Sequence, residues 1–279
     1  MKLKIALVQF EVKLNQSFNK TSKRIISYIR QAKAKHCQII CFPEDFWFGP
    51  LDCYSLKERT EITGLIKIKI LDWIKKQAKQ YKINIIAGTL IEKINQGYFN
   101  TCYFINDKGI VVANYKKRKL VPYGFEGSGI KAGNRQFTVV VINGIKVGVI
   151  ICRELFYPDI CYQLKKQGAE LIICLSFWPK NSSDYLKNKL HNDYHIVSAM
   201  RVVDALCQAR SFENELCFCF VYAAGRLIKA KEFDVLLGRT QVCLPFLGCI
   251  KKLPQNKKGM IIFSYDKTII ADARKSYKL

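Results

Sequence analysis

Apolar residues along the chain recur with two periods, one typical of buried strands and one typical of helices that pack on one face. Strand-like segments lie at 1–10, 39–42, 85–89, 111–115, 148–151, 171–176, 217–223 and 242–265. Helical spacing occupies 18–34, 65–81, 159–167 and 186–213. Strands that alternate with helices predict an α/β fold in which helices cover sheets.

Two turn sequences indicate that the sheets are not purely parallel. Asn-Asp-Lys-Gly at 106–109 and Asn-Gly at 143–144 lie between strand-like segments and are typical of hairpins. Asn15 or Ser17 can cap the helix expected from residue 18. No linker or internal repeat divides the chain, so we expect a single domain over 1–279.

Neither secretion nor membrane insertion is expected. Residues 1–10 alternate like a strand and do not have the regions of a signal peptide. The longest apolar stretch, 171–178, is too short to span a bilayer. The twelve cysteines occur in a chain too long to need disulfides, so they are expected to be reduced thiols. These features predict a cytoplasmic protein.

The formal net charge of +24 raises nucleic acid or an anionic surface as a partner. The lysines are spread over 20–35, 67–82, 116–119 and 251–258, without a zinc finger, a Gly-rich phosphate loop or an aromatic-interleaved basic motif. This distribution favours a solvated, lysine-rich surface. Nucleic acid is therefore not expected as a partner, except through non-specific adhesion at low salt.

Three polar residues stand where apolar strands end, and functional groups concentrate at such positions in α/β proteins. Cys152 follows the strand 148–151 and enters a polar turn before a helix. Glu44 follows a strand that ends in Phe-Pro, and Lys117 lies in the basic cluster 116–119 after a third strand. Each feature taken singly has a simpler interpretation: Cys152 as an inert buried thiol, Phe-Pro-Glu as a chance match, and the cluster 116–119 as a solvated basic face.

In the order Glu44, Lys117, Cys152, these motifs resemble the nitrilase superfamily of carbon–nitrogen hydrolases. Its members carry Glu after a strand ending in Phe-Pro, Lys in Tyr-Arg-Lys-x-His-Leu, and Cys after a Gly-x-x-Ile strand. Further segments similar to family sequences are 2–9, 85–89, 131–134, 168–172 and 208–214. The resemblance covers nearly the whole chain and implies a four-layer α-β-β-α sandwich with the catalytic residues at one end.

The resemblance also implies a thiol-dependent hydrolase of non-peptide C–N bonds in a small amide or N-carbamoyl substrate. A thiol with a pKa of about 8.5 is mostly protonated at neutral pH. Glu44 would therefore take the proton of Cys152 and later donate it to the leaving amine. Lys117 would stabilise the oxyanion before water hydrolyses the acyl-enzyme. No cofactor or metal is expected.

Alternation along a strand places Lys117 and Lys119 on one face and Lys116 on the other. The resemblance selects Lys117, because Lys119 takes the position usually held by histidine. It further implies a second glutamate that orients the lysine. Glu126 is the only carboxylate between Lys117 and Cys152, although it also fits a surface-loop residue.

Three residues near the expected site are candidates for substrate binding. The Arg153 guanidinium suits a substrate carboxylate. It also suits an internal ion pair with Glu154, which is the interpretation favoured here. Phe177 and Trp178 follow a strand end and either wall the acyl pocket or pack in the core.

Two pairs have the spacing of metal ligands. His191 and His195 lie four apart on an expected helix, and Cys217 and Cys219 share one face of a strand. Neither pair has further ligands in the sequence, so no metal site is predicted.

Two other functional classes stay open. Residues 120–124 resemble a loop of apolipoprotein N-acyltransferases, which use the same triad but carry membrane helices that this chain lacks. A catalytically inactive, basic relative that binds nucleic acid is the non-enzymatic alternative, and the intact triad argues against it. The family also implies a homodimer or higher homo-oligomer. Amide, N-carbamoyl and nitrile substrates are not separable from these motifs.

Overall fold

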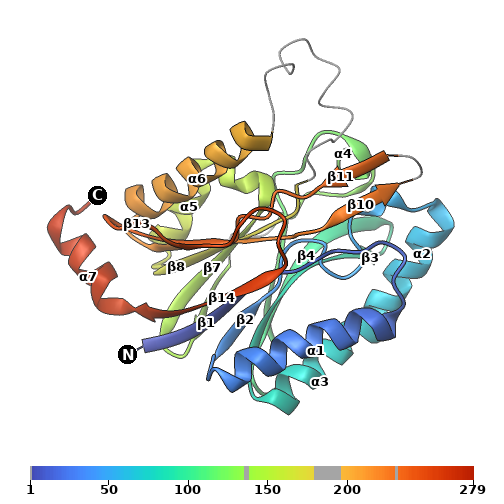
Figure 1. The fold of residues 1–279 in the computed structure, drawn as a ribbon, viewed down its shortest axis with the longest axis horizontal. Coiled ribbons are helices and arrows are strands. Elements are labelled where there is room, and N and C mark those ends of the chain that lie inside the picture. The colour runs from blue at the N-terminus through green and yellow to red at the C-terminus, as the bar shows by residue number, and fades with distance from the viewer. Residues whose placement is uncertain (1, 135–137, 179–195, 230–231) are drawn as a thin grey trace, which may run out of the picture.

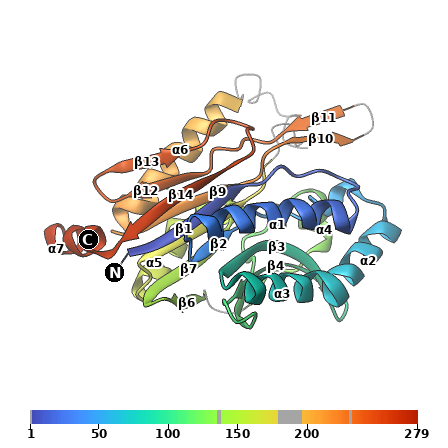
Figure 2. The same cartoon turned by 60° about the horizontal axis from the view of Figure 1, so that its bottom comes forward.

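The computed structural model describes residues 2–134, 138–178, 196–229 and 232–279. Two six-stranded sheets pack face to face at the centre, and helices lie along their outer faces (Figure 1). The turned view shows α1 and α3 on one sheet and α5 and α6 on the other (Figure 2). This four-layer α-β-β-α arrangement confirms the predicted fold class.

The first sheet has the strand order β14-β1-β2-β3-β4-β5. Its strands are β1 (Lys2–Gln9), β2 (Ile39–Cys41), β3 (Asn84–Ile94), β4 (Gly97–Ile105), β5 (Val111–Lys116) and β14 (Gly259–Asp266). β1, β2 and β3 run parallel, whereas β14, β4 and β5 pair antiparallel with their neighbours. The turn predicted at 106–109 joins β4 to β5, as expected.

The second sheet has the order β13-β12-β9-β8-β7-β6. Its strands are β6 (Val139–Ile142), β7 (Ile145–Ile151), β8 (Leu171–Ser176), β9 (Cys217–Tyr222), β12 (Gln241–Leu244) and β13 (Gly248–Lys252). β7, β8 and β9 are parallel. The predicted turn joins β6 to β7, with positive φ at Asn143 (48°) and Gly144 (77°), as a tight hairpin requires.

The helices are α1 (Phe18–Ala34), α2 (Leu56–Leu65), α3 (Leu71–Tyr81), α4 (Gly124–Gly129), α5 (Pro158–Lys166), α6 (Ile196–Glu213) and α7 (Lys267–Ser276). α1 has the predicted bounds, because the Ser17 side chain accepts the Lys20 N–H and caps its first turn. Ile25, Ile29 and Ala32 form its buried stripe. The sequence did not predict α4, α7 or the hairpin formed by β10 (Arg226–Lys229) and β11 (Glu232–Val235).

The predicted helix over 65–81 begins too late. The helical segment starts at Leu56, where Ser55 and Glu58 form a reciprocal capping box. Its buried apolar positions are Ile62, Ile66, Ile70, Ile74 and Ala78. In a helix of 3.6 residues per turn, side chains four residues apart differ in direction around the axis by about 40°. A π-helical turn at Ile66–Ile70 joins α2 to α3 and offsets this difference, so the apolar stripe stays on the sheet.

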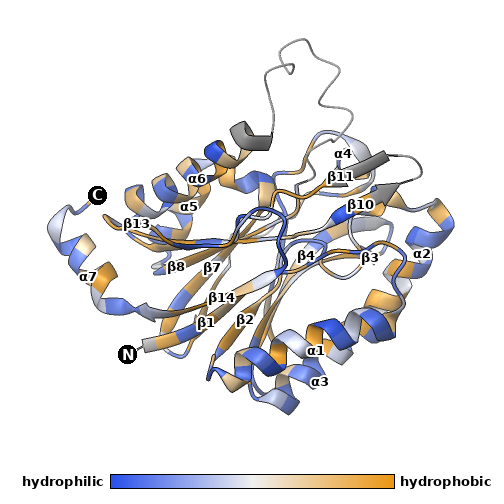
Figure 3. Ribbon diagram, viewed as in Figure 1, coloured by the Kyte–Doolittle hydropathy of each residue, from blue (hydrophilic) through white to orange (hydrophobic). Residues whose placement is uncertain are grey.

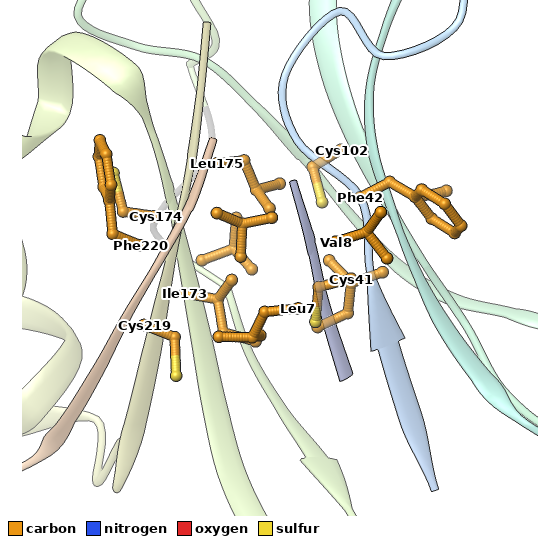
Figure 4. Close-up of a cluster of buried hydrophobic side chains, with 14 of the residues drawn as sticks. Leu7, Val8, Cys41, Phe42, Cys102, Ile173, Cys174, Leu175, Cys219 and Phe220 are labelled. Atoms are coloured by element: carbon orange, nitrogen blue, oxygen red, sulfur yellow. The ribbon is translucent and has the colours of Figure 1, made fainter. Parts of the chain in front are cut away.

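The main core lies between the two sheets. Ile173 and Leu175 of β8 point toward Leu7 and Cys41 of the first sheet, while Cys174 points to the opposite face (Figure 4). Apolar residues follow the strands and the inward sides of the helices (Figure 3). All twelve cysteines are free thiols, as expected. Among the described residues, no helix is long and apolar enough to cross a membrane.

Candidate active site

Four strands end at the same end of the sandwich, and the residue that follows each strand contributes a side chain or a backbone group to the site. Glu44 follows β2, Lys117 follows β5, Cys152 follows β7 and Phe177 follows β8. The Lys117 Nζ and the Phe177 N–H each donate to a Glu44 oxygen at 2.9 Å. The Cys152 Sγ lies 3.7 Å from the Phe177 carbonyl oxygen. These contacts bring residues from both sheets into one site.

A bulge in β3 shapes the turn that carries Glu44. The β3–β4 register shifts between Ala87 and Leu90. A Cβ atom at Gly88, where φ is +23°, would lie 2.0 Å from the Pro43 carbonyl oxygen. The adjacent Thr89 Oγ1 accepts the Asp45 N–H at 3.0 Å. Close backbone approach and this hydrogen bond together fix the position of the glutamate.

Lys117 is the central cation of the site. Its side chain is buried, and its Nζ lies 2.9 Å from Glu44 Oε1 and 2.8 Å from Glu126 Oε1. Glu126 is held in turn, because its Oε1 accepts the Val121 N–H at 2.8 Å. The Lys117 Nζ also donates to Glu126 Oε2 at 3.1 Å, so three carboxylate oxygens from two residues surround the ammonium.

Donors surround the Glu44 carboxylate. Besides Lys117 and the Phe177 N–H, the Asn100 Nδ2 donates to Oε1 at 2.9 Å. The Asn100 backbone carbonyl also accepts the Lys117 N–H at 2.9 Å, so one residue of β4 contacts both charged groups. Asn100 Oδ1 is buried without a hydrogen-bond partner. The sequence analysis missed Asn100, although an amide within a buried apolar strand is a usable signal.

Cys152 begins a 3₁₀ turn, Cys152–Phe156, in a left-handed conformation with φ of 48°. That conformation is uncommon for a residue with a Cβ and is characteristic of strained turns that present a nucleophile. Its side chain is within hydrogen-bonding reach of Glu44. The thiol therefore stands at a strand end with a carboxylate beside it.

Burial and charge set the proton positions. Burial raises the pKa of Glu44, while the Lys117 charge opposes the rise. Burial and the Glu44 charge raise the pKa of Cys152 well above its usual value. Burial alone would lower the pKa of Lys117, but Glu44, Cys152 and Glu126 outweigh it and raise that pKa. These directions favour a protonated Cys152 thiol and a protonated Lys117 ammonium.

Comparison with known proteins shows the family to which this chain belongs. The family model described as carbon-nitrogen hydrolase matches residues 4–275. The chain belongs to the carbon-nitrogen hydrolase family. A curated relative, 2-oxoglutaramate amidase from Bacillus subtilis (strain 168), is 26% identical over 227 residues, which are 81% of this chain and 76% of the relative.

Two solved structures share the fold of this carbon-nitrogen hydrolase. One, a carbon-nitrogen hydrolase from Helicobacter pylori G27, has a TM-score of 0.86 at 16% identity and covers 100% of this chain and 94% of its own. The other is a variant of the amidase from Nesterenkonia sp. AN1, with the acetamide moiety of fluoroacetamide added covalently at its active-site cysteine. It has a TM-score of 0.77 at 16% identity and covers 99% and 96% of the two chains.

The structure separates the three lysine candidates of this carbon-nitrogen hydrolase. Lys117 lies inside the site, Lys119 is exposed, and the Lys116 Nζ packs over the Phe99 ring at 4.1 Å from its centroid. Alternation therefore failed for Lys119, because β5 ends at Lys116 and the chain turns after it. The selected register agrees with the geometry, while the role of Lys117 in catalysis stays a prediction.

The favoured ion pair between Arg153 and Glu154 is wrong. Arg153 donates to the Leu120 carbonyl, and its guanidinium lies 5.7 Å from the centroid of the Tyr157 ring. Glu154 is fully buried and accepts the Tyr115 hydroxyl at 2.7 Å together with backbone N–H groups. Adjacent side chains in a 3₁₀ turn point about 120° apart, so one faces inward while the other stays partly exposed.

Phe177 and Trp178 are positioned differently from each other. The Phe177 ring is buried, and its backbone N–H and carbonyl contact Glu44 and Cys152. Trp178 is partly buried and packs edge-on against Phe156 at 5.8 Å between centroids. The backbone role of Phe177 was not predicted, because periodicity gives no information about which main-chain groups face a site.

The two metal-spaced pairs have different outcomes. His191 and His195 lie outside the described residues. The Cys217 and Cys219 sulfurs are 4.0 Å apart on buried β9. Within the part of the chain that the structure describes, no group of three or more His, Cys, Asp or Glu could hold a metal ion.

Proposed function

We propose that this carbon-nitrogen hydrolase is an amidase that cleaves small linear amides through a covalent thioester on Cys152. The observation that carries the proposal is the buried Lys117 ammonium held between Glu44 and Glu126, with Glu44 in reach of a thiol on a strained turn. An amide-hydrolysing relative, the 2-oxoglutaramate amidase, supports the same class.

In the first half-reaction the Cys152 sulfur attacks the amide carbonyl while Glu44 takes the thiol proton. Because the pKa of Cys152 is raised, proton removal accompanies attack rather than preceding it. The C–N bond then breaks, Glu44 gives its proton to the departing nitrogen, and ammonia leaves. In the second half-reaction Glu44 takes a proton from water, which attacks the thioester. The C–S bond then breaks, Glu44 returns this proton to the departing sulfur, and the carboxylic acid and the free thiol are released.

Lys117 stabilises the oxyanion in both half-reactions. An ammonium has three N–H donors, and we assign one to Glu44, one to Glu126 and the third to the oxyanion. A cation held by two fixed carboxylates needs little reorganisation when charge develops, which is how preorganised donors lower a barrier. The Arg153 backbone N–H, in the turn after the nucleophile, is proposed as a second donor.

Arg153, Phe177 and Trp178 are proposed to contact the substrate. Arg153 is the next residue after the nucleophile and has no carboxylate partner among the described residues, so a substrate carboxylate suits it. The apolar surface of Trp178 is proposed to border the acyl chain. ω-Amides that carry a distal carboxylate are therefore expected to outperform neutral amides of equal length.

Ammonia release from a panel of ω-amides, N-carbamoyl amines and nitriles tests the proposal, with Cys152→Ala as the matched blank. Turnover of amides that the blank lacks is the expected result. Activity on nitriles alone, or acyl transfer to an amine without net hydrolysis, would reassign the reaction. Salt-sensitive nucleic-acid binding without any turnover would favour the non-enzymatic alternative.

Assembly as a homodimer is also proposed. Phe212 of α6, Phe246 and Tyr277 are 42%, 47% and 61% exposed, and their rings pack together with centroids 4.8–6.3 Å apart. Such an exposed aromatic cluster is more typical of an interface than of a monomer surface. Sedimentation at micromolar concentration should give a dimer, and a stable, active monomer would contradict it.

The family match over 4–275 supports one domain, and the free thiols support a cytoplasmic location.

A further inference from the structure

Glu154 is a buried carboxylate that the proposed mechanism does not use. It lies two residues after the nucleophile and is 0% exposed. Burial raises its pKa, and hydrogen bonds from Tyr115, Arg118 and Ile151 oppose that rise. A buried acid is costly unless its oxygens are satisfied, so the partners of this side chain indicate what it does.

Its partners come from both sides of the site. Oε1 accepts the Tyr115 hydroxyl at 2.7 Å and the backbone N–H groups of Arg118 and Lys119 at 2.8 and 3.3 Å. Oε2 accepts the Ile151 N–H at 2.8 Å. The Arg118 and Lys119 N–H groups belong to the two residues after Lys117, and the Ile151 N–H belongs to the residue before Cys152.

We infer that Glu154 is a positioning residue that holds the lysine loop, residues 117–121, against the nucleophile turn, residues 151–156. The inference rests on the function proposed above, since it explains how the Lys117 ammonium and the Cys152 sulfur keep their relative position. Glu154 itself touches neither the reacting atoms nor the ammonium; it acts through backbone on either side of them.

The number of donors explains why a carboxylate is required. Two ionised oxygens accept all four donors, and neither offers a proton that would repel an N–H. An amide at this position keeps one acceptor oxygen, so its NH₂ must face either Ile151 or the lysine loop. One connection is then lost, and the two segments can move apart by a fraction of an ångström or more. Misplacement of about 1 Å can cost roughly 100-fold in rate.

Arg153 adds a second connection in the same direction. Its guanidinium donates to the Leu120 carbonyl, so consecutive residues of the nucleophile turn both bind the lysine loop. The Glu154 contact is the buried one of the two and contacts the backbone nearest Lys117.

Glu154→Gln and Glu154→Asp are the test variants, the second because it keeps the charge but is one methylene too short to reach both segments. Glu215→Gln is the matched control. Glu215 is 2% exposed and also accepts a backbone N–H, from Leu279 at 3.1 Å, but it lies next to the start of β9 rather than at the strand ends that form the site. Each variant is first shown to be folded by its urea transition.

The kinetic split separates positioning from a merely structural role. In folded Glu154 variants kcat should fall roughly 100-fold with KM changed only a few-fold, whereas Glu215→Gln should lower stability and keep kcat. In the Lys117→Met background, Glu154→Gln should add little further loss, because both changes remove the same function. An unchanged kcat in either folded Glu154 variant, or a fully additive loss in the double variant, would overturn the inference.

Alkylation of Cys152 by fluoroacetamide is measured in the same variants. It should slow in both Glu154 variants and not in Glu215→Gln. If the wild-type protein hydrolyses no amide, the proposed function fails, but this alkylation rate still reports whether Glu154 positions the site. Equal alkylation rates in wild type and Glu154→Gln would overturn the positioning role even where hydrolysis is found.

Discussion

Replacing Lys117 with methionine removes the one buried cation that two carboxylates of the site share. Lys117→Met keeps a side chain of similar length, so the change is chiefly one of charge. Glu44 then keeps the Asn100 amide and the Phe177 N–H as nitrogen donors, but has no cation beside it. Glu126 keeps the Val121 N–H.

Both the rate and the stability should change. Loss of one preorganised oxyanion donor lowers kcat by roughly 10²–10³-fold. Breaking a buried ion pair by removing one partner costs about 3–5 kcal/mol, a large part of the 5–15 kcal/mol that is typical of a folded protein. Without the cation, burial holds the folded-state pKa of Glu44 further above the unfolded value of about 4.3. An acid with a raised folded pKa destabilises the fold as pH rises, so the deficit should be larger at pH 8 than at pH 4.5.

Ammonia release and urea unfolding across this pH range measure the two effects in Lys117→Met, Lys116→Met and Lys119→Met. The two control lysines are outside the site: Lys119 is exposed, and Lys116 is half-buried against the Phe99 ring. Charges near the surface contribute little. Both controls should stay within a few-fold of wild-type activity. Equal losses at Lys117 and Lys119, or a stability deficit that grows toward acid pH, would refute the reasoning.

Three further predictions follow from the same site. The acid limb of kcat/KM should lie above pH 4.5, because Glu44 must be ionised to act as the base and burial raises its pKa; full activity at pH 4 would contradict this. Asp45→Asn should raise the free energy of unfolding at pH 7 more than at pH 3. Burial and the Glu44 charge raise the pKa of Asp45, so charging this buried acid costs stability above about pH 3.9. A pH-independent difference in urea titrations would count against this prediction. Gly88→Ala should cost about 1–3 kcal/mol and lower kcat, because its Cβ would lie 2.0 Å from the Pro43 oxygen; normal kcat and stability would show that the bulge does not position Glu44.

Elements that depend on a few neighbouring residues could be predicted from local sequence patterns. α1 begins where Ser17 caps it, and the β6–β7 hairpin turns at Asn143 and Gly144, because each depends on a few neighbouring residues. α7 was not predicted, although its start has a local signal, because the Asp266 side chain accepts the Thr268 N–H at 3.0 Å. Its contacts with the rest of the fold are distant in sequence: Arg274 donates to the Ala169 and Glu215 carbonyls, and periodicity over ten residues carries no information about them.

The site was only partly predictable for the same reason. Strand ends and the family resemblance selected Glu44, Lys117, Cys152 and Glu126, which the structure brings together. Their supports could not be derived. Neither the Asn100 contact with Glu44 nor the inward orientation of Glu154 follows from spacing, because both depend on how β4, β5 and β7 meet in three dimensions.

Labelling by fluoroacetamide, followed by peptide mass spectrometry, tests the central claim that Cys152 is the nucleophile. Cys249 is the chemical rival, because its hydrogen bond with Cys243 and the Lys252 charge lower its pKa to about 7 and it is only half-buried. Fluoride is a poor leaving group for an unassisted thiol, so labelling should need the Lys117 ammonium beside the thiol. We predict acetamide addition at Cys152 alone, with the rate greatly lowered in Lys117→Met. Labelling at Cys249 with Cys152 unmodified, or labelling of Cys152 at an unchanged rate in Lys117→Met, would contradict the account.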